Sequence, residues 1–421
     1  MIILFIFPSF PSYKRPSVSF QRMGYPYVFR CLSAVTPKKY LIEIVDERFD
    51  KINFNKNYDI VGITTYTANA FHAYEIADKF REKGVKVVLG GYHASALPDE
   101  AKQHADSVVI GEAEETWPQL LKDFEKGKLK PFYRQTRPVD LSTIPLYDAT
   151  FIGERSIRNV IQTSRGCPNG CEFCAITNSE FGRRYRTRPI DHVLKELITV
   201  PQKNIFFLDP SLTTNVNRTK LLFKKLRNLN KKFLCNGTVN VLSKDDELLR
   251  LASEAGCVEW FVGFESLSQE NINAIGKRTN VVKEYKIAVK KIHDHGMLVT
   301  ASFIFGFDGD TKNVFSETLD AAYDMEVDSA GFHILTPYPG TPLFERLERE
   351  GRILTKDWSR YRELDSVVFQ PKNMTPYELL DGTQYVKKEF FSFNNVVIRS
   401  LKTMKIGMYP FIQNALVKNL P

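Results

Sequence analysis

Two runs of alternating strand-like and helix-like segments constrain this chain of 421 residues more than any other feature. In the first run, helical patterns such as Ala70–Lys83 and Thr116–Lys126 separate short apolar segments that are typical of buried strands. These predicted strands are Ile2–Phe7, Tyr40–Val45, Ile60–Thr64, Lys86–Leu89 and Ser107–Ile110. Because strands that alternate with helices pair in parallel, the run predicts a doubly wound α/β sheet.

The second run begins near Asn159 and has the same alternation. Its predicted strands are Val160–Thr163, Ile205–Leu208, Phe233–Thr238, Trp260–Gly263, Thr300–Phe305 and Ser329–Leu335. The predicted helices between them include Asp191–Thr199, Arg218–Asn228, Lys244–Ala255 and Lys283–His295. Roughly six β/α units suffice for an open, partial barrel, and such enzymes place their chemistry at the carboxyl ends of the strands.

The segments outside these runs indicate the boundaries. From about Pro131 to Ser156 the chain has three prolines and little periodicity, which is typical of a linker. We expect a first domain over 1–135, a linker over 136–156, a barrel over 157–342 and a small helical C-terminal region over 343–421. The last segment, from Phe390, is basic and apolar. It predicts an amphipathic surface helix or, by preference, a helix that packs back on the barrel.

Composition and the N-terminus indicate an ordinary globular protein. Hydrophobic residues make up 43% of the chain, and its net charge of +9 is spread along the predicted helices, which favours solvated faces over a nucleic-acid site. The apolar start, Met1–Phe7, has no basic residues before it and is followed by Pro8, so a buried strand explains it better than a signal peptide. No apolar run is long enough to span a membrane, and we expect a cytoplasmic protein.

Two glycine-containing turns follow strands of the first run. Gly90 and Gly91 come directly after one predicted strand, and Gly111 and Glu112 follow the next. Glycine at the carboxyl end of a parallel strand lets a ligand approach the backbone, although a tight turn explains the pair equally well. The chain has no G-x-G-x-x-G pattern, so a dinucleotide site is not supported.

Three of the six cysteines lie within eight residues, in the loop after the first strand of the second run. They are Cys167, Cys171 and Cys174, whereas Cys31, Cys235 and Cys257 are isolated and are expected to be buried packing residues. Clustered cysteines in a reducing compartment indicate a metal centre or catalysis rather than disulfides. Structural zinc and most iron–sulfur clusters take four ligands. No fourth ligand lies nearby at such spacing, so three thiolates would leave a reactive coordination position open.

The spacing C-x-x-x-C-x-x-C, with Phe173 before the last cysteine, resembles the signature of the radical S-adenosylmethionine (SAM) superfamily. The resemblance implies a 4Fe–4S cluster on the three cysteines and SAM on its open iron. Reduction of the cluster then cleaves SAM to methionine and a 5′-deoxyadenosyl radical. It also implies an electron donor such as flavodoxin or ferredoxin.

Later segments are similar to the parts of that family that bind SAM. Asp209 ends the second barrel strand, Glu265 ends a later one, and Gly306 lies in a segment like the fifth-strand motif beside the adenine. With Phe173 they form the SAM set that the resemblance implies. For each, a turn at a strand end or a helix N-cap is the alternative.

The first run resembles the N-terminal, Rossmann-like cobalamin-binding domain of one large radical SAM subgroup. The resemblance extends from about Met1 to Phe369 and implies that Thr64, Thr65, Gly90, Gly91 and Glu112 contact cobalamin. The D-x-H-x-x-G motif, whose His ligates cobalt, is absent. Members without it are thought to hold cobalamin with no protein ligand from below. His93 follows the glycine turn and lies near the corrin or is a satisfied histidine at the surface.

Three functions follow from these features. The first is a cobalamin-dependent enzyme that methylates an unactivated carbon of a small-molecule or lipid substrate. The second is a radical oxidative cyclase or carbon–carbon coupling enzyme that uses the same cofactors without methyl transfer. The third is a non-catalytic, metal-stabilised binding protein. The basic, apolar tail favours a lipid-derived substrate and peripheral contact with a membrane.

Overall fold

The computed structural model describes residues 1–10, 26–146 and 158–402. Its first sheet has six parallel strands in the order β2-β1-β3-β4-β5-β6. The strands are β1 (Ile2–Phe7), β2 (Leu41–Asp46), β3 (Ile60–Thr64), β4 (Lys86–Gly90), β5 (Ser107–Ile110) and β6 (Phe132–Arg134). The helices are α2 (Tyr27–Val35), α3 (Ala70–Glu82), α4 (Tyr92–Ala96), α5 (Pro98–Gln103) and α6 (Thr116–Glu125). The strand order reverses between β1 and β3, where doubly wound sheets bind ligands.

The apolar N-terminus is the centre of this sheet. All of Ile3–Phe7 is buried, with Leu4 and Ile6 in one core cluster and Ile3 and Phe5 in another. Since side chains alternate along a strand, the two faces of β1 supply two cores, which is why the segment reads as an unbroken apolar run. The expected strand is confirmed.

One expectation for this sheet is wrong. The segment from about Pro131 was expected to be a linker, but Phe132–Arg134 forms β6 and pairs with β5 over Val108–Ile110. A three-residue strand at a sheet edge is too short for a period of two to be recognised. The rest of the expected linker reaches 147–157, which lies outside the described residues.

The second sheet has six parallel strands in the order β14-β13-β12-β11-β10-β7, and its end strands β7 and β14 do not pair with each other. The strands are β7 (Arg158–Ile161), β10 (Asn204–Phe207), β11 (Lys232–Gly237), β12 (Cys257–Glu265), β13 (Leu298–Phe305) and β14 (Ser329–Ile334). The helices are α8 (Ile190–Thr199), α9 (Val216–Leu226), α10 (Val239–Leu242), α11 (Asp246–Ala255), α12 (Gln269–Ala274), α13 (Tyr285–Asp294) and α14 (Val314–Asp324). The expected open, partial (β/α)6 barrel is confirmed.

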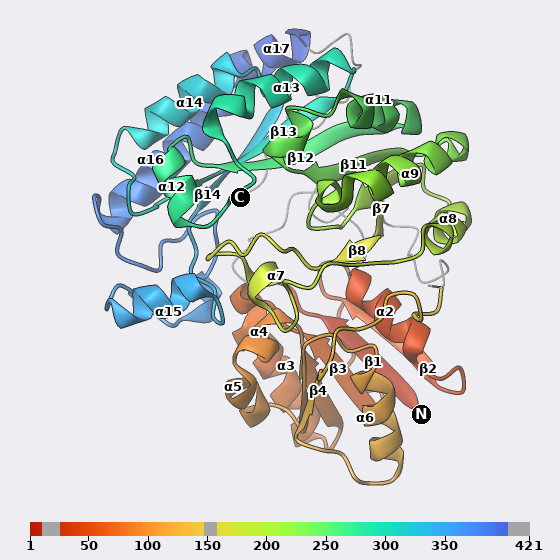
Figure 1. The fold of residues 1–421 in the computed structure, drawn as a ribbon. Coiled ribbons are helices and arrows are strands. Elements are labelled where there is room, and N and C mark those ends of the chain that lie inside the picture. Colours follow the sequence, from red (N-terminus) through yellow and green to blue (C-terminus); the bar gives the residue numbers. More distant parts are fainter. Residues whose placement is uncertain (11–25, 147–157, 403–421) are drawn as a thin grey trace.

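A short two-stranded element and one helical turn lie between the two sheets (Figure 1). The strands are β8 (Ser164–Arg165) and β9 (Arg186–Thr187), which pair antiparallel, and the turn is α7 (Ala175–Asn178). In Figure 1 the first sheet occupies the lower half of the molecule and the barrel the upper half. The cysteine loop is thereby placed at the junction of the two sheets.

The segment after the barrel, expected to be a small helical C-terminal region, packs on both sheets. Phe344 of α15 (Pro342–Arg349) and Trp358, Tyr361 and Val368 are part of a buried core cluster of the first sheet. The next helix, α16 (Pro376–Phe390), packs instead against α14 and β14 of the barrel. The segment after the barrel therefore ties the two sheets together, a contact between distant segments that no local pattern encodes.

The described part of the tail packs back on the barrel, as preferred from the sequence. In α17 (Phe393–Lys402), Val396 is buried in the barrel core, and the Arg399 guanidinium lies 3.7 Å from the centre of the Phe390 ring. Residues 403–421 of the tail lie outside the described residues. No helix in the described ranges combines the length and the apolar character needed to cross a bilayer.

Candidate active site

The cysteine loop, Thr163–Cys174, leaves the carboxyl end of β7 and is fixed by hydrogen bonds around the three cysteines. The Cys167 amide donates to the Gly182 carbonyl at 2.8 Å, and the Thr177 hydroxyl donates to the Cys167 carbonyl at 2.7 Å. The Asn178 amide group donates to the carbonyls of both Cys171 and Cys174, each at 2.9 Å. These hydrogen bonds use the backbone groups of the three cysteines and not their thiols, so the thiols remain available to bind a metal.

Glycine is required at one point of this loop. Gly166 has φ +83°, and a Cβ there would lie 2.2 Å from the Arg184 carbonyl oxygen. No other residue can adopt this conformation without strain and a clash. The segment around Arg184, which leads into β9, is therefore packed directly on the loop.

The three thiols are reduced and differ in burial. Cys171 is buried, whereas Cys167 and Cys174 are half-buried. Burial raises the pKa of Cys171 to about 12 and also raises the pKa of Cys174, so metal binding has to displace their protons. Within the described ranges, no three His, Cys, Asp or Glu side chains converge as they would around a single metal ion. A cluster of four irons binds each thiolate at a different iron, so its ligands lie farther apart than the ligands of a single metal ion.

The isolated cysteines are buried, as expected. Cys235 and Cys257 lie on neighbouring barrel strands with their sulfur atoms 3.9 Å apart and form no disulfide. Cys31 does more than pack, since the Arg165 guanidinium donates to its sulfur at 3.4 Å.

A buried ion pair borders the cysteines from the barrel side. Glu265, the last residue of β12, accepts a hydrogen bond from the Lys277 ammonium group. Burial disfavours the Lys277 charge, but Glu265 outweighs it, and the pKa of Lys277 is raised. Burial raises the pKa of Cys171, and the charge of Lys277 opposes part of that rise. Glu265 has φ +63°, a conformation that costs a non-glycine residue about 1–3 kcal/mol and is typical of functional sites.

Asp209 lies at the end of β10 with none of its surface exposed. Its carboxylate accepts hydrogen bonds from the Thr163 amide at 3.0 Å, from the Thr163 hydroxyl at 2.8 Å and from the Ser164 hydroxyl. Burial raises the pKa of Asp209, although these donors and Arg218 oppose the shift. In this structure Asp209 therefore holds the start of the cysteine loop, and a contact with SAM remains a prediction.

Phe173 and Gly306 have different surroundings in the barrel. Phe173 is half-buried against the barrel core. Gly306 follows β13 with φ +107°, and a Cβ there would meet Leu379 of α16 at 2.9 Å. Its amide donates at 2.9 Å to Asp310, whose pKa is raised to about 6 by burial.

The residues predicted to contact cobalamin gather at the carboxyl edge of the first sheet. The Thr65 hydroxyl donates to the Gly90 carbonyl at 2.9 Å and accepts from the Ala94 amide at 3.0 Å, so it joins β3 to the glycine turn. Gly91 has φ +100°, and a Cβ there would lie 2.6 Å from the Thr65 carbonyl oxygen and 2.9 Å from the Thr64 hydroxyl. The missing side chain of Gly91 is thus required by protein packing.

His93 is a satisfied histidine, but it is buried rather than at the surface. Its exposed fraction is 1%, and its ring nitrogens lie 3.1 Å from the Glu100 carboxylate and 3.4 Å from the Thr67 hydroxyl. The edge of the imidazole packs against Trp358. With both nitrogens engaged, His93 belongs to the contact between the first sheet and the C-terminal segment.

Sequence reasoning missed a row of aromatic side chains at this edge. The Tyr66 ring centre lies 6.0 Å from that of Phe7 and 6.3 Å from that of Tyr92. The side chains of Tyr66 and Tyr92 are each 42% exposed. Surrounding protein atoms nevertheless raise the pKa of both hydroxyl groups by desolvation. Each tyrosine therefore has one part in contact with protein and another part in contact with solvent. The aromatic row, Phe7, Tyr66 and Tyr92, thus runs along the carboxyl edge of the first sheet.

Ion pairs join the two sheets next to this row, and sequence reasoning did not find them. The Arg165 guanidinium lies 2.5 Å from the Glu114 carboxylate, and Arg186 makes two 2.7 Å hydrogen bonds with Glu112. Glu112, predicted to contact cobalamin, is therefore paired across the junction. The acidic residues after β5 were the available signal, but only the fold shows which arginines meet them.

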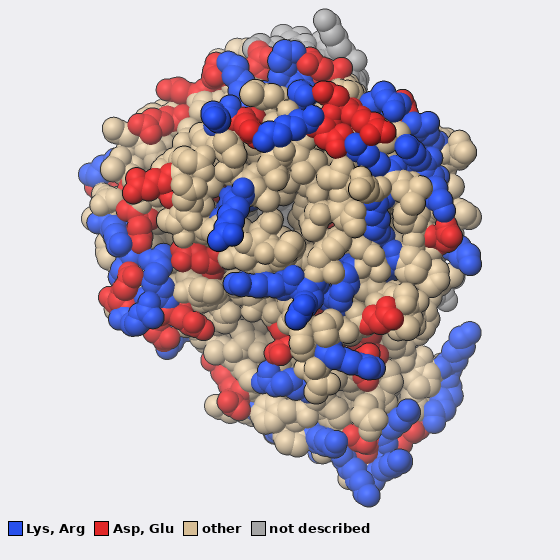
Figure 2. Space-filling model, in the orientation of Figure 1, with Lys and Arg blue, Asp and Glu red and all other residues tan. Residues whose placement is uncertain are grey.

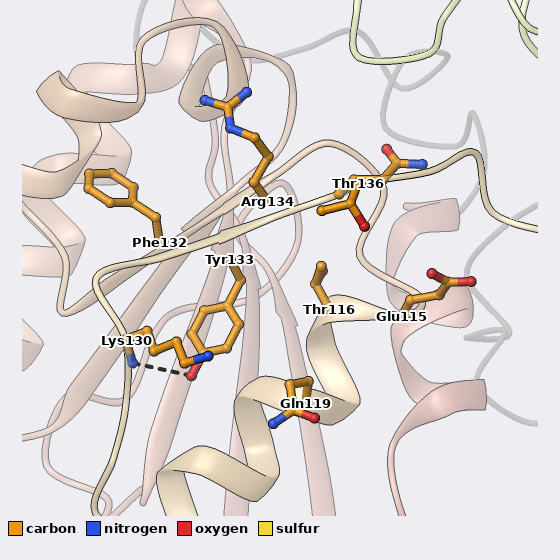
Figure 3. Close-up of a pocket in the computed structure, with 9 residues that line it drawn as sticks. Glu115, Thr116, Gln119, Lys130, Phe132, Tyr133, Arg134 and Thr136 are labelled. Atoms are coloured by element: carbon orange, nitrogen blue, oxygen red, sulfur yellow. Dashed lines mark hydrogen bonds between the residues drawn. The ribbon is translucent and has the colours of Figure 1, made fainter.

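A separate groove lies at the β6 edge of the first sheet. It encloses about 310 Å³ and is lined by residues of α6, β6 and the flanking turns, including Glu115, Lys130, Phe132 and Arg134 (Figure 3). None of the predicted site residues lines it. The junction and this groove are distinct features of the molecule.

Comparisons with known proteins agree with this arrangement. The B12 binding domain model matches residues 38–121, and the radical SAM superfamily model matches residues 161–322. The chain is 31% identical over 382 residues to the bacteriochlorophyllide d C-12(1)-methyltransferase of Chlorobaculum tepidum, covering 87% of this chain and 83% of that protein. The chain belongs to the radical SAM superfamily. It is an enzyme, as expected, and the alternative of a non-catalytic binding protein is set aside.

This radical SAM enzyme is also similar to a cyclase in sequence and to a solved cobalamin-dependent enzyme in fold. It is 28% identical over 379 residues to the anaerobic magnesium-protoporphyrin IX monomethyl ester cyclase of Cereibacter sphaeroides, covering 80% of this chain and 61% of that protein. Its fold matches the cobalamin-dependent SAM radical enzyme OxsB, solved with aqua-cobalamin and SAM, with a TM-score of 0.70 at 17% identity. That match covers 99% of this chain and 71% of OxsB.

The cofactors of this enzyme are a 4Fe–4S cluster, SAM and cobalamin. The residues present fit all three. Three reduced thiols on one loop suit a cluster with an open iron. The Glu265–Lys277 pair brings both charge signs next to them, as the amino and carboxylate groups of SAM require. The exposed faces of Tyr66 and Tyr92 suit a large conjugated ring such as a corrin.

Proposed function

We propose that this radical SAM enzyme methylates an unactivated carbon of an apolar small-molecule or lipid substrate. The carrying observation is the ion pair between Arg165 of the cysteine loop and Glu114, which follows β5 at the carboxyl edge of the first sheet. The carboxyl edges of the two sheets thereby face a common space. A substrate bound there would border both cofactor sites, as a reaction that uses a radical and a methyl donor in turn requires.

The cofactors supply the chemistry when bound: reductive cleavage of SAM yields a 5′-deoxyadenosyl radical, and methylcobalamin supplies the methyl group. The chain supplies the positions. We propose that Cys167, Cys171 and Cys174 hold the cluster and that Phe173, Glu265 and Gly306 border SAM. Thr64, Thr65 and Gly90 would then lie beside the corrin, with the exposed rings of Tyr66 and Tyr92 against it.

Two relatives support the methyl-transfer proposal and its apolar substrate. One is named for methyl transfer to bacteriochlorophyllide d and matches most of the chain. The other is named as a cyclase of magnesium-protoporphyrin IX monomethyl ester, so oxidative ring closure without methyl transfer is the second candidate. Both names describe large ring compounds, which favours a substrate of that class here.

A labelling experiment tests the proposal. Anaerobically reconstituted enzyme is incubated with methyl-deuterated SAM, a reductant and an extract of the source cells, and products are examined by mass spectrometry. Methyl transfer predicts a product that gains a deuterated methyl group and formation of 5′-deoxyadenosine. A product that loses hydrogen without label would favour the cyclase. Cys171→Ala should abolish 5′-deoxyadenosine formation, whereas Cys235→Ala, which changes a buried cysteine of β11 outside the loop, should keep it.

We also propose that the protein is cytoplasmic and touches a membrane through its tail. Two apolar side chains of α17 support this, since Phe393 is 69% exposed and Ile398 is 53% exposed. Exposed apolar groups on a basic helix favour binding to an anionic membrane surface. Sedimentation with anionic vesicles tests the proposal. The double variant Phe393→Ser/Ile398→Ser should stay in the supernatant, and equal sedimentation of variant and parent would contradict it.

A further inference from the structure

One arginine of the helix after the barrel bridges two segments that were predicted to border SAM. Arg346 lies in α15, and its guanidinium group donates to the Glu172 carboxylate at 2.9 Å and to the Asp308 carboxylate at 2.8 Å. Glu172 stands between two of the cysteines and directly before Phe173, and Asp308 follows Gly306 by two residues. A single side chain therefore connects the cysteine loop to the turn after β13.

The main chain of Glu172 is fixed on both of its polar groups. Its amide donates to the Ile275 carbonyl of the barrel at 3.1 Å, and its carbonyl accepts from the Leu343 amide of α15 at 3.2 Å. Because these bonds hold the backbone, the Glu172 carboxylate has a defined position relative to α15. The contact with Arg346 is thus part of how the loop is seated.

Asp308 is held from the segment after the barrel. Besides Arg346 it pairs with Arg352 at 2.9 Å and with Lys372 at 3.1 Å. Burial acts to raise the pKa of Asp308, but the hydrogen bonds from Arg352 and Lys372 and the charge of Arg346 outweigh it, and the pKa is lowered. In the described part of the chain, Arg346 is the one cation that pairs with both Asp308 and Glu172.

The helix that carries Arg346 is anchored in two cores. Leu343 is buried in the barrel core, and its neighbour Phe344 is buried in a core cluster of the first sheet. Glu350, one turn further along α15, lies 3.5 Å from the Arg346 guanidinium group and restricts it further. Ion pairs between mobile side chains contribute little, but a guanidinium fork on a fixed helix loses less freedom when it binds two carboxylates.

The charges around α15 are mixed in sign. Figure 2 shows acidic and basic side chains interspersed over the region where α15 lies in Figure 1. The ion pairs there are Arg346–Glu172, Arg346–Asp308 and Arg352–Asp308. Charges that neutralise one another within the protein favour a role in positioning over the attraction of a charged partner.

We propose that Arg346 is a positioning residue for SAM, because it holds the Phe173 end of the cysteine loop and the Gly306 turn at a fixed separation. The proposal rests on the part of the proposed function in which Phe173 and Gly306 border SAM. Arg346 acts through Glu172 and Asp308 and touches no reacting atom. Without the bridge, the two borders can shift relative to each other, so SAM binds less tightly while the cysteines keep the cluster.

The test measures SAM binding directly. Arg346→Gln removes the charge and the fork but keeps most of the side-chain stem. Arg349→Gln is the matched control, since Arg349 is an exposed arginine of the same helix that pairs with no carboxylate among the described residues. Equilibrium dialysis of the reconstituted, oxidised enzyme with radiolabelled SAM should give a Kd about tenfold higher for Arg346→Gln and the parent value for Arg349→Gln. Iron content should match the parent in both variants.

Two further readouts separate positioning from a general loss of structure. In dithionite-driven cleavage of SAM, the KM for SAM should rise in Arg346→Gln while kcat changes by less than about twofold. Arg346→Lys keeps the charge but lacks the planar fork, so its SAM affinity should lie between those of the parent and Arg346→Gln.

Three outcomes would overturn the proposal: unchanged SAM affinity in Arg346→Gln, loss of iron from that variant, or an equal loss of SAM affinity in Arg349→Gln. Because the test measures SAM and iron and not methylation, failure to find methyl transfer would count against the proposed function and not against the role of Arg346.

Discussion

Arg186 of β9 donates one 2.7 Å hydrogen bond to each carboxylate oxygen of Glu112, which follows β5. The pair connects the strand that returns from the cysteine loop to the carboxyl edge of the first sheet. Arg186 also donates to the Val139 carbonyl at 3.0 Å. One side chain thus fixes three segments at the junction, and the relative position of the two cofactor sites depends on it.

This pair predicts measurable coupling. In a cycle of Glu112→Ala, Arg186→Ala and the double variant, we expect a coupling free energy of roughly 1–2 kcal/mol, because the bond is bidentate and mostly shielded from water. Urea unfolding monitored by circular dichroism measures it. Additive effects of the two single changes would mean that the ion pair contributes nothing beyond its separate side chains.

The glycine turn after β4 predicts opposite outcomes at neighbouring positions. Gly91→Ala places a Cβ 2.6 Å from the Thr65 carbonyl oxygen in a conformation reserved for glycine, and should destabilise the protein by roughly 2–4 kcal/mol. Gly90→Ala makes only ordinary contacts, with the Val109 carbonyl oxygen at 3.7 Å and the Val109 Cβ at 3.8 Å, and should cost less than about 1 kcal/mol. Thermal unfolding of the cobalamin-free protein distinguishes packing from cofactor contact, since equal stability of the two variants would remove the packing argument.

We expect removal of the Asp209 carboxylate to weaken binding of the cluster and not only binding of SAM. Asp209→Ala leaves the buried hydroxyls of Thr163 and Ser164 without their acceptor, so the start of the cysteine loop should loosen at a cost of about 2–4 kcal/mol. Iron content after anaerobic reconstitution should fall well below that of the parent. Full iron content with weakened SAM binding, measured by equilibrium dialysis, would instead support the SAM contact predicted from the sequence.

The raised pKa of Asp310 makes the free energy of unfolding depend on pH. Burial raises its pKa from 3.8 to about 6. The folded state therefore favours the protonated form, and this contribution is present below the unfolded pKa and lost as pH rises through about 6. By about pH 7 the loss amounts to roughly 3 kcal/mol.

Asp310→Asn cannot ionise and should lack this dependence. The difference in unfolding free energy between variant and parent should shift in favour of the variant by about 2–3 kcal/mol between about pH 4 and pH 7. Denaturant unfolding at several pH values measures the shift. A constant difference across that range would show that Asp310 has an ordinary pKa in the folded protein.

Much of this architecture could be predicted from the residues in order. The apolar run Ile2–Phe7 reports a strand with both faces buried, and the alternation of strands and helices leads directly to two parallel sheets. The spacing of Cys167, Cys171 and Cys174 places three thiols on one loop at a strand end. These features are local, because hydrophobic periodicity and residue spacing can be recognised within short segments of the sequence.

Only the tertiary structure decided which of these local features meet. The sequence predicts Gly91 and Glu112 as cofactor contacts, and the tertiary structure adds that Thr65 occupies the space where a Gly91 side chain would lie and that Arg186 pairs with Glu112. The pairing of Arg165 in the cysteine loop with Glu114, some fifty residues earlier in the chain, depends on how the two sheets are oriented by contacts such as Trp358 in the first core. Such contacts depend on where the folded chain returns in space, so no local pattern records them.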